Sequence, residues 1–164
     1  MSQGNDSANT APTDDRELTV TRTVAAPREL VWRAWTEAER ISGWWGPTGF
    51  STTTHEMDLR PGGRWRYTMH GPDGVDYPNL VEYEEVVAPE RLVYSHGSDE
   101  DPKQFRTTVT FNETTYETTI TMRMVFRSVE DREAAARFGA VEGAESTLEC
   151  LSEYLSGQHE EEGS

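Results

Sequence analysis

The chain has 164 residues, and its 30 Asp and Glu against 15 Lys and Arg give a formal net charge of −15 at pH 7. A surface this negative repels phosphate backbones and anionic lipid headgroups, which excludes a general nucleic-acid binder and a membrane-surface protein. Cys150 is the only cysteine, so neither an internal disulfide nor a cysteine-rich metal site is available. The bias toward Arg, with Lys103 as the single lysine, suggests adaptation to high salt or a GC-rich genome.

The two ends of the chain are small, polar and acidic, which is typical of disordered segments. We expect disordered tails at residues 1–17 and 157–164, flanking a single domain at residues 18–156. The first tail lacks the basic and apolar regions of a signal peptide, and no apolar run is long enough to cross a bilayer. We therefore expect a cytoplasmic protein.

The first predicted elements are a strand over residues 18–24 and a helix pair that follows it. Polar and apolar side chains alternate in the strand, although Arg22 falls on the apolar side. Arg22 is either a buried partner for a carboxylate such as Glu85 or an edge residue whose charged end reaches solvent. Apolar side chains then recur at helical spacing from Leu30 to Ile41, which predicts the helix pair.

Six further strands are predicted, and the loops of their hairpins set the register. A three-residue loop at Pro61–Gly63 would place Leu59 opposite Trp65 and Asp58 opposite Arg66. A two-residue loop would slip the register by one and bring Asp58 against Trp65, so it is rejected. In the predicted register the apolar side chains of both strands share one face.

Two later hairpins are predicted in the same way. A four-residue loop at 112–115 would pair Phe111 with Tyr116. A tight turn at Pro89–Glu90 would gather four polar or aromatic side chains on one face of its hairpin. These four side chains are Tyr83, Glu85, Tyr94 and His96.

The last predicted element is a helix from about Glu130 to Ser156, in which apolar side chains follow a helical period. Small side chains at 139–144 allow a kink or a close approach halfway along it. The order of elements predicts an α+β fold. A seven-stranded curved antiparallel sheet is followed by the long C-terminal helix, which covers its apolar face, and a short helix pair comes after the first strand.

Five short segments of the chain resemble one protein family. They are residues 26–32, 44–50, 58–65, 71–74 and 89–94, which read APRELVW, WWGPTGF, DLRPGGRW, GPDG and PERLVY. In this order they are similar to the AHSA-like family, named for the activator of heat-shock-protein-90 ATPase, in the prokaryotic branch of the START/SRPBCC superfamily. The resemblance covers about residues 18–155 and implies the helix-grip fold, in which a curved sheet wraps a long C-terminal helix around an apolar cavity. In the last helix, Glu142-Gly143 is followed by Ala144 rather than by the Trp that is common in this branch.

Motifs for metal, phosphate or nucleophilic chemistry are absent from the sequence. The histidines lack metal-ligand spacing, and there is neither a glycine-rich phosphate loop nor a nucleophile elbow. We therefore expect no metal, no cofactor and no nucleophilic catalysis. Of the histidines, His55 and His96 are predicted to face inward, whereas His70 faces outward and His159 lies in the tail.

Two features of the predicted cavity have more than one interpretation. Glu85 and His96 would shift each other's pKa in an apolar cavity and could move a proton. The alternative is a polar cross-strand cluster at the sheet edge. The Trp44-Trp45 turn is either a gate over the cavity, or an anchor with one ring buried against the helix pair and the other at the surface.

We predict that the protein binds a small apolar or amphipathic molecule between the sheet and the last helix, without catalysis. His96, Glu85 and Tyr83 are the expected polar anchors. The full predicted lining is Trp65, Tyr67, Met69, Tyr83, Glu85, Tyr94, His96, Phe105, Val109, Met122, Met124, Phe138 and Val141. The resemblance also implies two alternatives: a polyketide-cyclase-like enzyme that uses His96 and Glu85, and a chaperone-associated module that uses the outer sheet face or the Trp44-Trp45 loop. Whether the chain pairs with a second copy stays open.

Overall fold

The computed structural model describes residues 13–163, and its side chains are described for residues 15–157. Residues 1–12 and 164 of the predicted tails lie outside this range, as does the side chain of His159. Residues 13–16 form a turn of 3-10 helix, and the last helix continues to residue 163 instead of ending at 156. Gly157 lacks the positive φ with which a glycine commonly ends a helix. The disorder expected for the tails stays a prediction.

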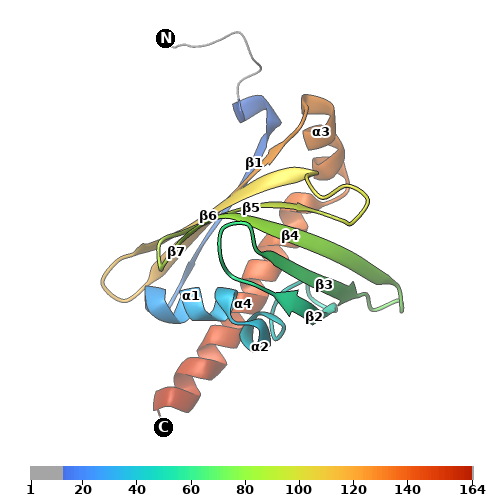
Figure 1. The fold of residues 1–164 in the computed structure, drawn as a ribbon. Coiled ribbons are helices and arrows are strands. Elements are labelled where there is room, and N and C mark those ends of the chain that lie inside the picture. Colours follow the sequence, from blue (N-terminus) through green and yellow to red (C-terminus); the bar gives the residue numbers. More distant parts are fainter. Residues whose placement is uncertain (1–12, 164) are drawn as a thin grey trace, which may run out of the picture.

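The order of helices and strands is the predicted one (Figure 1). The elements are η2 (Thr13–Arg16), β1 (Glu17–Val24), α1 (Arg28–Thr36), α2 (Ala38–Ile41), β2 (Ser51–Met57), β3 (Arg64–His70), β4 (Asp76–Val87), β5 (Arg91–Gly97), β6 (Phe105–Glu113), β7 (Thr118–Phe126), α3 (Val129–Arg137) and α4 (Ala140–Gly163). The strands form one antiparallel seven-stranded sheet in the order β1-β7-β6-β5-β4-β3-β2. The predicted α+β architecture, with its helix pair after the first strand, is therefore confirmed.

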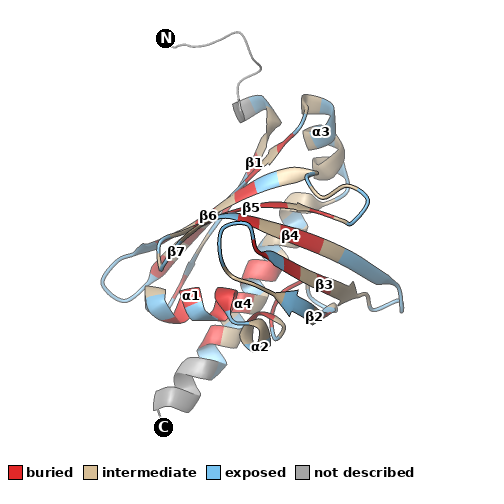
Figure 2. Ribbon diagram, viewed as in Figure 1, coloured by how far each residue is buried: buried red, intermediate tan, exposed pale blue. Residues whose placement is uncertain are grey.

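Helices α1, α2 and α4 lie on the same side of the sheet (Figure 1). Helix α4 packs mainly against β1, and α1 packs against β6. Leu148, Leu151 and Leu155 repeat at helical spacing along α4 and are buried, and Figure 2 shows the buried stretches of α1 and α4 facing the sheet. None of the helices in the described part of the chain is both long and apolar enough to span a membrane.

The β2–β3 hairpin has a longer loop than predicted. Met57, not Leu59, lies opposite Trp65, and Glu56, not Asp58, lies opposite Arg66. The loop is held open because the backbone N–H of Gly62 donates to the carbonyl of Tyr83 on β4 at 2.8 Å, a contact between segments distant in sequence. The predicted register is thus wrong by two residues, and an even shift leaves Trp65 on its predicted face.

A bulge between Thr54 and Glu56 turns His55 outward, against prediction. The Nε2 atom of His55 lies 2.8 Å from the hydroxyl of Thr68 at the surface. Thr54 points inward instead, and its hydroxyl accepts a hydrogen bond from the indole of Trp65 at 3.1 Å. Of the two histidines expected to face inward, only His96 does so.

The β6–β7 hairpin also differs in register from the prediction. Its loop spans residues 114–117, so that Phe111 lies opposite Ile120. Tyr116 is in the loop and is 83% exposed. The difference is again an even number of residues, so every inward-facing side chain of both strands stays inward.

The single C-terminal helix that was predicted is broken into α3 and α4. Gly139 adopts a left-handed φ of 88°, which ends α3 and changes the direction of the chain. Phe138, immediately before this glycine, is 89% exposed. The prediction that Phe138 lies between the sheet and the helix is therefore wrong, because the break rotates it to the surface.

The tight loop before β3 leaves no space for a side chain at Gly63. A Cβ atom at Gly63 would overlap the backbone oxygen of Asp58, which only a movement of the main chain can relieve. Gly63→Ala should lower the free energy of unfolding by about 2 kcal/mol in urea denaturation. The control is Gly157→Ala on α4, where a Cβ atom meets nothing within 4 Å. This change should raise stability by about 0.5 kcal/mol, because Ala favours a helix. Equal effects of the two changes would contradict the steric argument.

Candidate functional site

Three cross-strand rows of side chains define the concave face of the sheet. From β4 to β7 the rows are Val81, His96, Phe105 and Phe126; then Tyr83, Tyr94, Thr107 and Met124; then Val86, Leu92, Val109 and Met122. Trp65, Tyr67 and Met69 continue this face on β3. All the predicted lining residues that lie on strands are therefore brought together on one face, with the exception of Glu85.

Glu85 faces away from the predicted site. A bulge between Tyr83 and Glu85 places Glu85 opposite Val93 instead of Tyr94. Its carboxylate accepts hydrogen bonds from Arg91 at 2.6 and 3.0 Å on the outer surface. One extra residue in a strand reverses the side of every residue beyond it, so Glu85 and His96 lie on opposite faces of the sheet. Both interpretations of Glu85 and His96 given above, an acid–base pair and a polar cluster that holds both side chains, are therefore wrong.

His96 has uncharged hydrogen-bond partners. Its Nε2 atom lies 2.9 Å from the hydroxyl of Tyr67 and 3.2 Å from Oδ1 of Asn79. The side-chain amide of Asn79 donates to the carbonyl of Tyr77 at 2.9 Å, which fixes Oδ1 as the atom that faces the imidazole. An amide oxygen only accepts, so the imidazole proton resides on Nε2 and Nδ1 is left as an acceptor. Nδ1 has no hydrogen-bond partner among the described side chains, residues 15–157.

The electrostatics of this cluster follow from burial. Desolvation lowers the pKa of His96 from its ordinary 6.5 to about 4, because the charged imidazolium is disfavoured. Burial likewise raises the pKa of the Tyr67, Tyr83 and Tyr94 hydroxyls far above their ordinary value. The cluster is therefore neutral at pH 7 and offers hydrogen bonds without charge.

The partly exposed side chains mark the accessible part of the concave face. Val109 and Tyr94 are buried completely, whereas His96, Phe105 and Met69 keep partial exposure. The ring of Phe105 lies 5.0 Å from the imidazole of His96. On the helical side, small or short apolar side chains at the start of α4 are also partly exposed, namely Ala140, Val141 and Ala144. The accessible wall is thus apolar, with the His96 imidazole as its polar group.

Asn79 is a site residue that the sequence analysis did not find. It lies opposite Tyr67 on β3 and two residues from Val81, which faces His96. Its position in the cluster depends on the registers of two hairpins, neither of which is encoded locally. The available signal was a polar side chain on the inward side of an alternating strand, where it needs a hydrogen-bond partner.

Both tryptophans of the Trp44-Trp45 turn are buried, so neither forms a gate and neither lies at the surface. The indole of Trp44 donates to the carbonyl of Ala34 on α1 at 3.0 Å. The ring of Trp45 lies 5.2 Å from that of Trp65 and 6.1 Å from that of Tyr67. The turn therefore anchors the helix pair to the concave face and supports the partner of His96.

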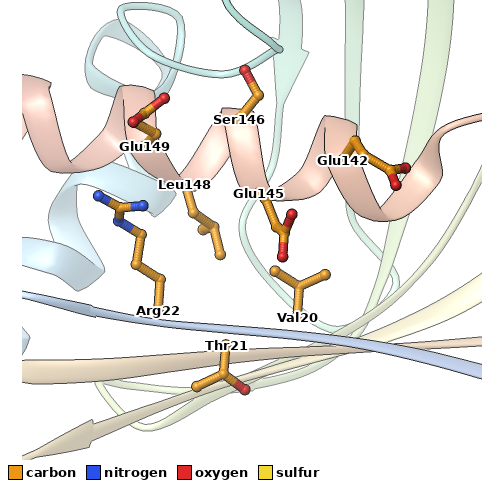
Figure 3. Close-up of a pocket in the computed structure, with 8 residues that line it drawn as sticks. All are labelled: Val20, Thr21, Arg22, Glu142, Glu145, Ser146, Leu148 and Glu149. Atoms are coloured by element: carbon orange, nitrogen blue, oxygen red, sulfur yellow. The ribbon is translucent and has the colours of Figure 1, made fainter.

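Arg22 lies on the inner face of β1, opposite Ile120 on β7. It does not meet Glu85, so the first of the two interpretations of Arg22, a pair with that carboxylate, is wrong. Arg22 lines a pocket of about 390 Å³ between β1 and α4 instead (Figure 3). Three glutamates of α4 share this pocket: Glu142, Glu145 and Glu149.

A curved antiparallel sheet whose concave face packs on a C-terminal helix defines the helix-grip class of domains. The family model described as Activator of Hsp90 ATPase homolog 1-like protein matches residues 25–156. The chain therefore belongs to this family, within the SRPBCC superfamily. A search of curated proteins finds no match.

Solved bacterial structures agree with this assignment. Protein Ms6760 from Mycobacterium smegmatis is 29% identical, with a TM-score of 0.82 over 92% of this chain and 97% of that one. Protein NE0264 from Nitrosomonas europaea is 27% identical, with a TM-score of 0.81 over 88% of this chain and 97% of that one. The AHSA1 protein from Silicibacter pomeroyi, at 22% identity and a TM-score of 0.70, covers 87% of this chain and 99% of its own length and shares the fold.

Proposed function

We propose that the protein binds a small apolar or amphipathic molecule on the accessible part of the concave face, between the sheet and the start of α4. The observation that carries this proposal is the unpartnered Nδ1 acceptor of His96 in a partly exposed apolar wall. A ligand that carries one hydrogen-bond donor on an apolar body would satisfy both features of the site.

The charge state of the site narrows the ligand class. His96 is neutral at pH 7, and its hydrogen-bond partners, the Tyr67 hydroxyl and the Asn79 amide, are neutral as well. A charged headgroup would enter this wall without a counter-charge, which is unfavourable away from water. A hydroxyl, or the N–H of an arylamine that stays neutral at pH 7, on a hydrocarbon or aromatic body fits better. The adaptable side chains of Met69, Met122 and Met124 would let the wall adjust to the shape of the ligand.

The test uses a neutral fluorescent probe, N-phenyl-1-naphthylamine, whose N–H can donate to Nδ1 of His96. We expect a saturable rise in its fluorescence with the native protein. Val141 is partly exposed at the start of α4. Val141→Trp should lower the affinity for the probe at least tenfold, about 1.4 kcal/mol of binding free energy, because the larger side chain occupies the site.

The control is Ser156→Trp, which adds the same side chain at an exposed position of α4. It should leave the affinity unchanged, and thermal unfolding should be cooperative for both variants. No saturable binding by the native protein, or equal binding by both variants, would contradict the proposal.

A further inference from the structure

Arg22 interrupts the apolar side of β1 with a charged group. Its neighbours on that side, Val20 and Val24, are buried. The Nε atom of Arg22 is buried and lacks a hydrogen-bond partner in the described part of the chain. A buried N–H without an acceptor is unfavourable, and it shows that no protein group in the described part of the chain compensates this side of the guanidinium.

The pocket in front of Arg22 is lined by β1 on one side and α4 on the other. Figure 3 shows the Arg22 side chain directed from β1 toward α4, and the Glu145 carboxylate directed from α4 toward β1. The buried side chains of Leu148 and Val20 form the apolar base of the pocket, with Val20 below Glu145, while Thr21 points away. The pocket thus offers the Arg22 guanidinium as a donor on β1, the Glu145 carboxylate as an acceptor on α4, and an apolar base formed by Val20 and Leu148.

These charges do not neutralise each other directly. Among residues 15–157, no carboxylate lies within ion-pair distance of the Arg22 guanidinium, although Glu142, Glu145 and Glu149 line the same pocket. A simple anion at Arg22 would face three carboxylates, and a simple cation at these carboxylates would face Arg22. Only a ligand that carries both charges meets an opposite charge at each end.

We infer that the pocket between β1 and α4 binds a small zwitterion, with its carboxylate on Arg22, its ammonium group on Glu145 and a short aliphatic body over Val20 and Leu148. Figure 3 places the Glu145 carboxylate above Val20, and Val20 and Arg22 are two residues apart on a strand, which spans about 7 Å. This spacing fits an amino acid whose two charges are separated by several methylene groups. The site shares none of its lining residues with the concave-face site around His96, so the inference goes beyond the proposed function.

The probes are 5-aminopentanoate, pentanoate and pentylamine, titrated by calorimetry into the full chain at low ionic strength. We expect 5-aminopentanoate to bind at least tenfold more tightly than either singly charged analogue. Arg22→Met and Glu145→Gln should each weaken the binding of 5-aminopentanoate at least tenfold. The control is Glu153→Gln, which removes an exposed carboxylate of α4 outside the pocket and should leave the affinity unchanged.

Two further measurements keep the result interpretable. Arg22→Met should retain cooperative unfolding and undiminished binding of N-phenyl-1-naphthylamine, which separates this site from the one near His96. The NMR signal of the Arg22 Nε–H in the native protein should shift when 5-aminopentanoate is added. Equal binding of the three probes, no binding of 5-aminopentanoate, or an Arg22 guanidinium already paired with Glu145 or Glu149 in solution would overturn the inference.

Discussion

Trp45→Ala should lower the free energy of unfolding by about 4 kcal/mol, because it removes a large ring from the centre of the core. Trp45 is 8% exposed, and its ring contacts those of Trp35, Trp44, Trp65 and Tyr67 at centroid separations of 5.8, 5.5, 5.2 and 6.1 Å. Edge-to-face pairs of this kind add to the free energy of burial.

Denaturation in urea, followed by far-UV circular dichroism, measures this effect. The matched control is Tyr116→Ala, which also removes an aromatic ring but at an 83% exposed position of the β6–β7 loop. Its effect should be below about 0.5 kcal/mol. Trp45→Ala should also weaken the binding of N-phenyl-1-naphthylamine, because the ring of Trp45 packs near Tyr67, the hydrogen-bond partner of His96. A loss of stability similar to that of Tyr116→Ala would contradict the central role of the ring.

A second expected result is a loss of stability on acidification that depends on His96. The pKa of this imidazole falls from 6.5 to about 4 on folding, because burial disfavours its charged form. Between these two values the unfolded chain binds a proton that the folded chain does not, so the free energy of unfolding decreases as the pH falls. Above pH 6.5 the effect is absent.

The contribution of His96 is isolated by comparison with His96→Gln, which retains hydrogen-bonding groups for Tyr67 and Asn79 but does not titrate. From pH 7 to pH 4.5, the native protein should lose about 2 kcal/mol more than the variant. The many carboxylates of the chain act equally in both proteins and cancel in the difference. Parallel pH profiles would mean that His96 is solvated or already protonated in the folded state.

Binding of an apolar ligand should lower the pKa of His96 further. A molecule that covers the accessible wall removes the remaining water from the imidazole, which opposes protonation further. Stabilisation by N-phenyl-1-naphthylamine should therefore be greater at pH 7 than below pH 4, where His96 becomes protonated in the folded protein. This links the electrostatic and the binding experiments through one side chain.

The sequence predicted which side chains face inward but not which of them meet. Alternation with a period of two is a local property, and it correctly assigned Trp65, Tyr94 and Met122 to one face. Registers that differ by an even number of residues satisfy this pattern equally well. The loops before β3 and β7 were misjudged for that reason, without a change of face.

Bulges were the source of the errors that mattered for chemistry. A bulge adds one residue and reverses the side of the residues beyond it. Near Tyr83 this moved Glu85 to the outer surface, and in β2 it moved His55 outward. No composition or periodicity signal marks these two positions. Whether an extra residue is inserted depends on how the strand pairs with its neighbour, which a local pattern does not contain.

The chain by itself determined the order of its elements, the burial of the apolar rows and the family to which it belongs, because local periodicity and short motifs carry that information. Only the tertiary structure decided that His96 meets Tyr67 and Asn79, that Phe138 is exposed at the α3–α4 break, and that Arg22 faces α4 without a partner among the described residues. These outcomes depend on hydrogen bonds and packing between segments far apart in sequence, such as the contact of Gly62 with Tyr83. Such contacts choose among registers that local patterns leave equivalent.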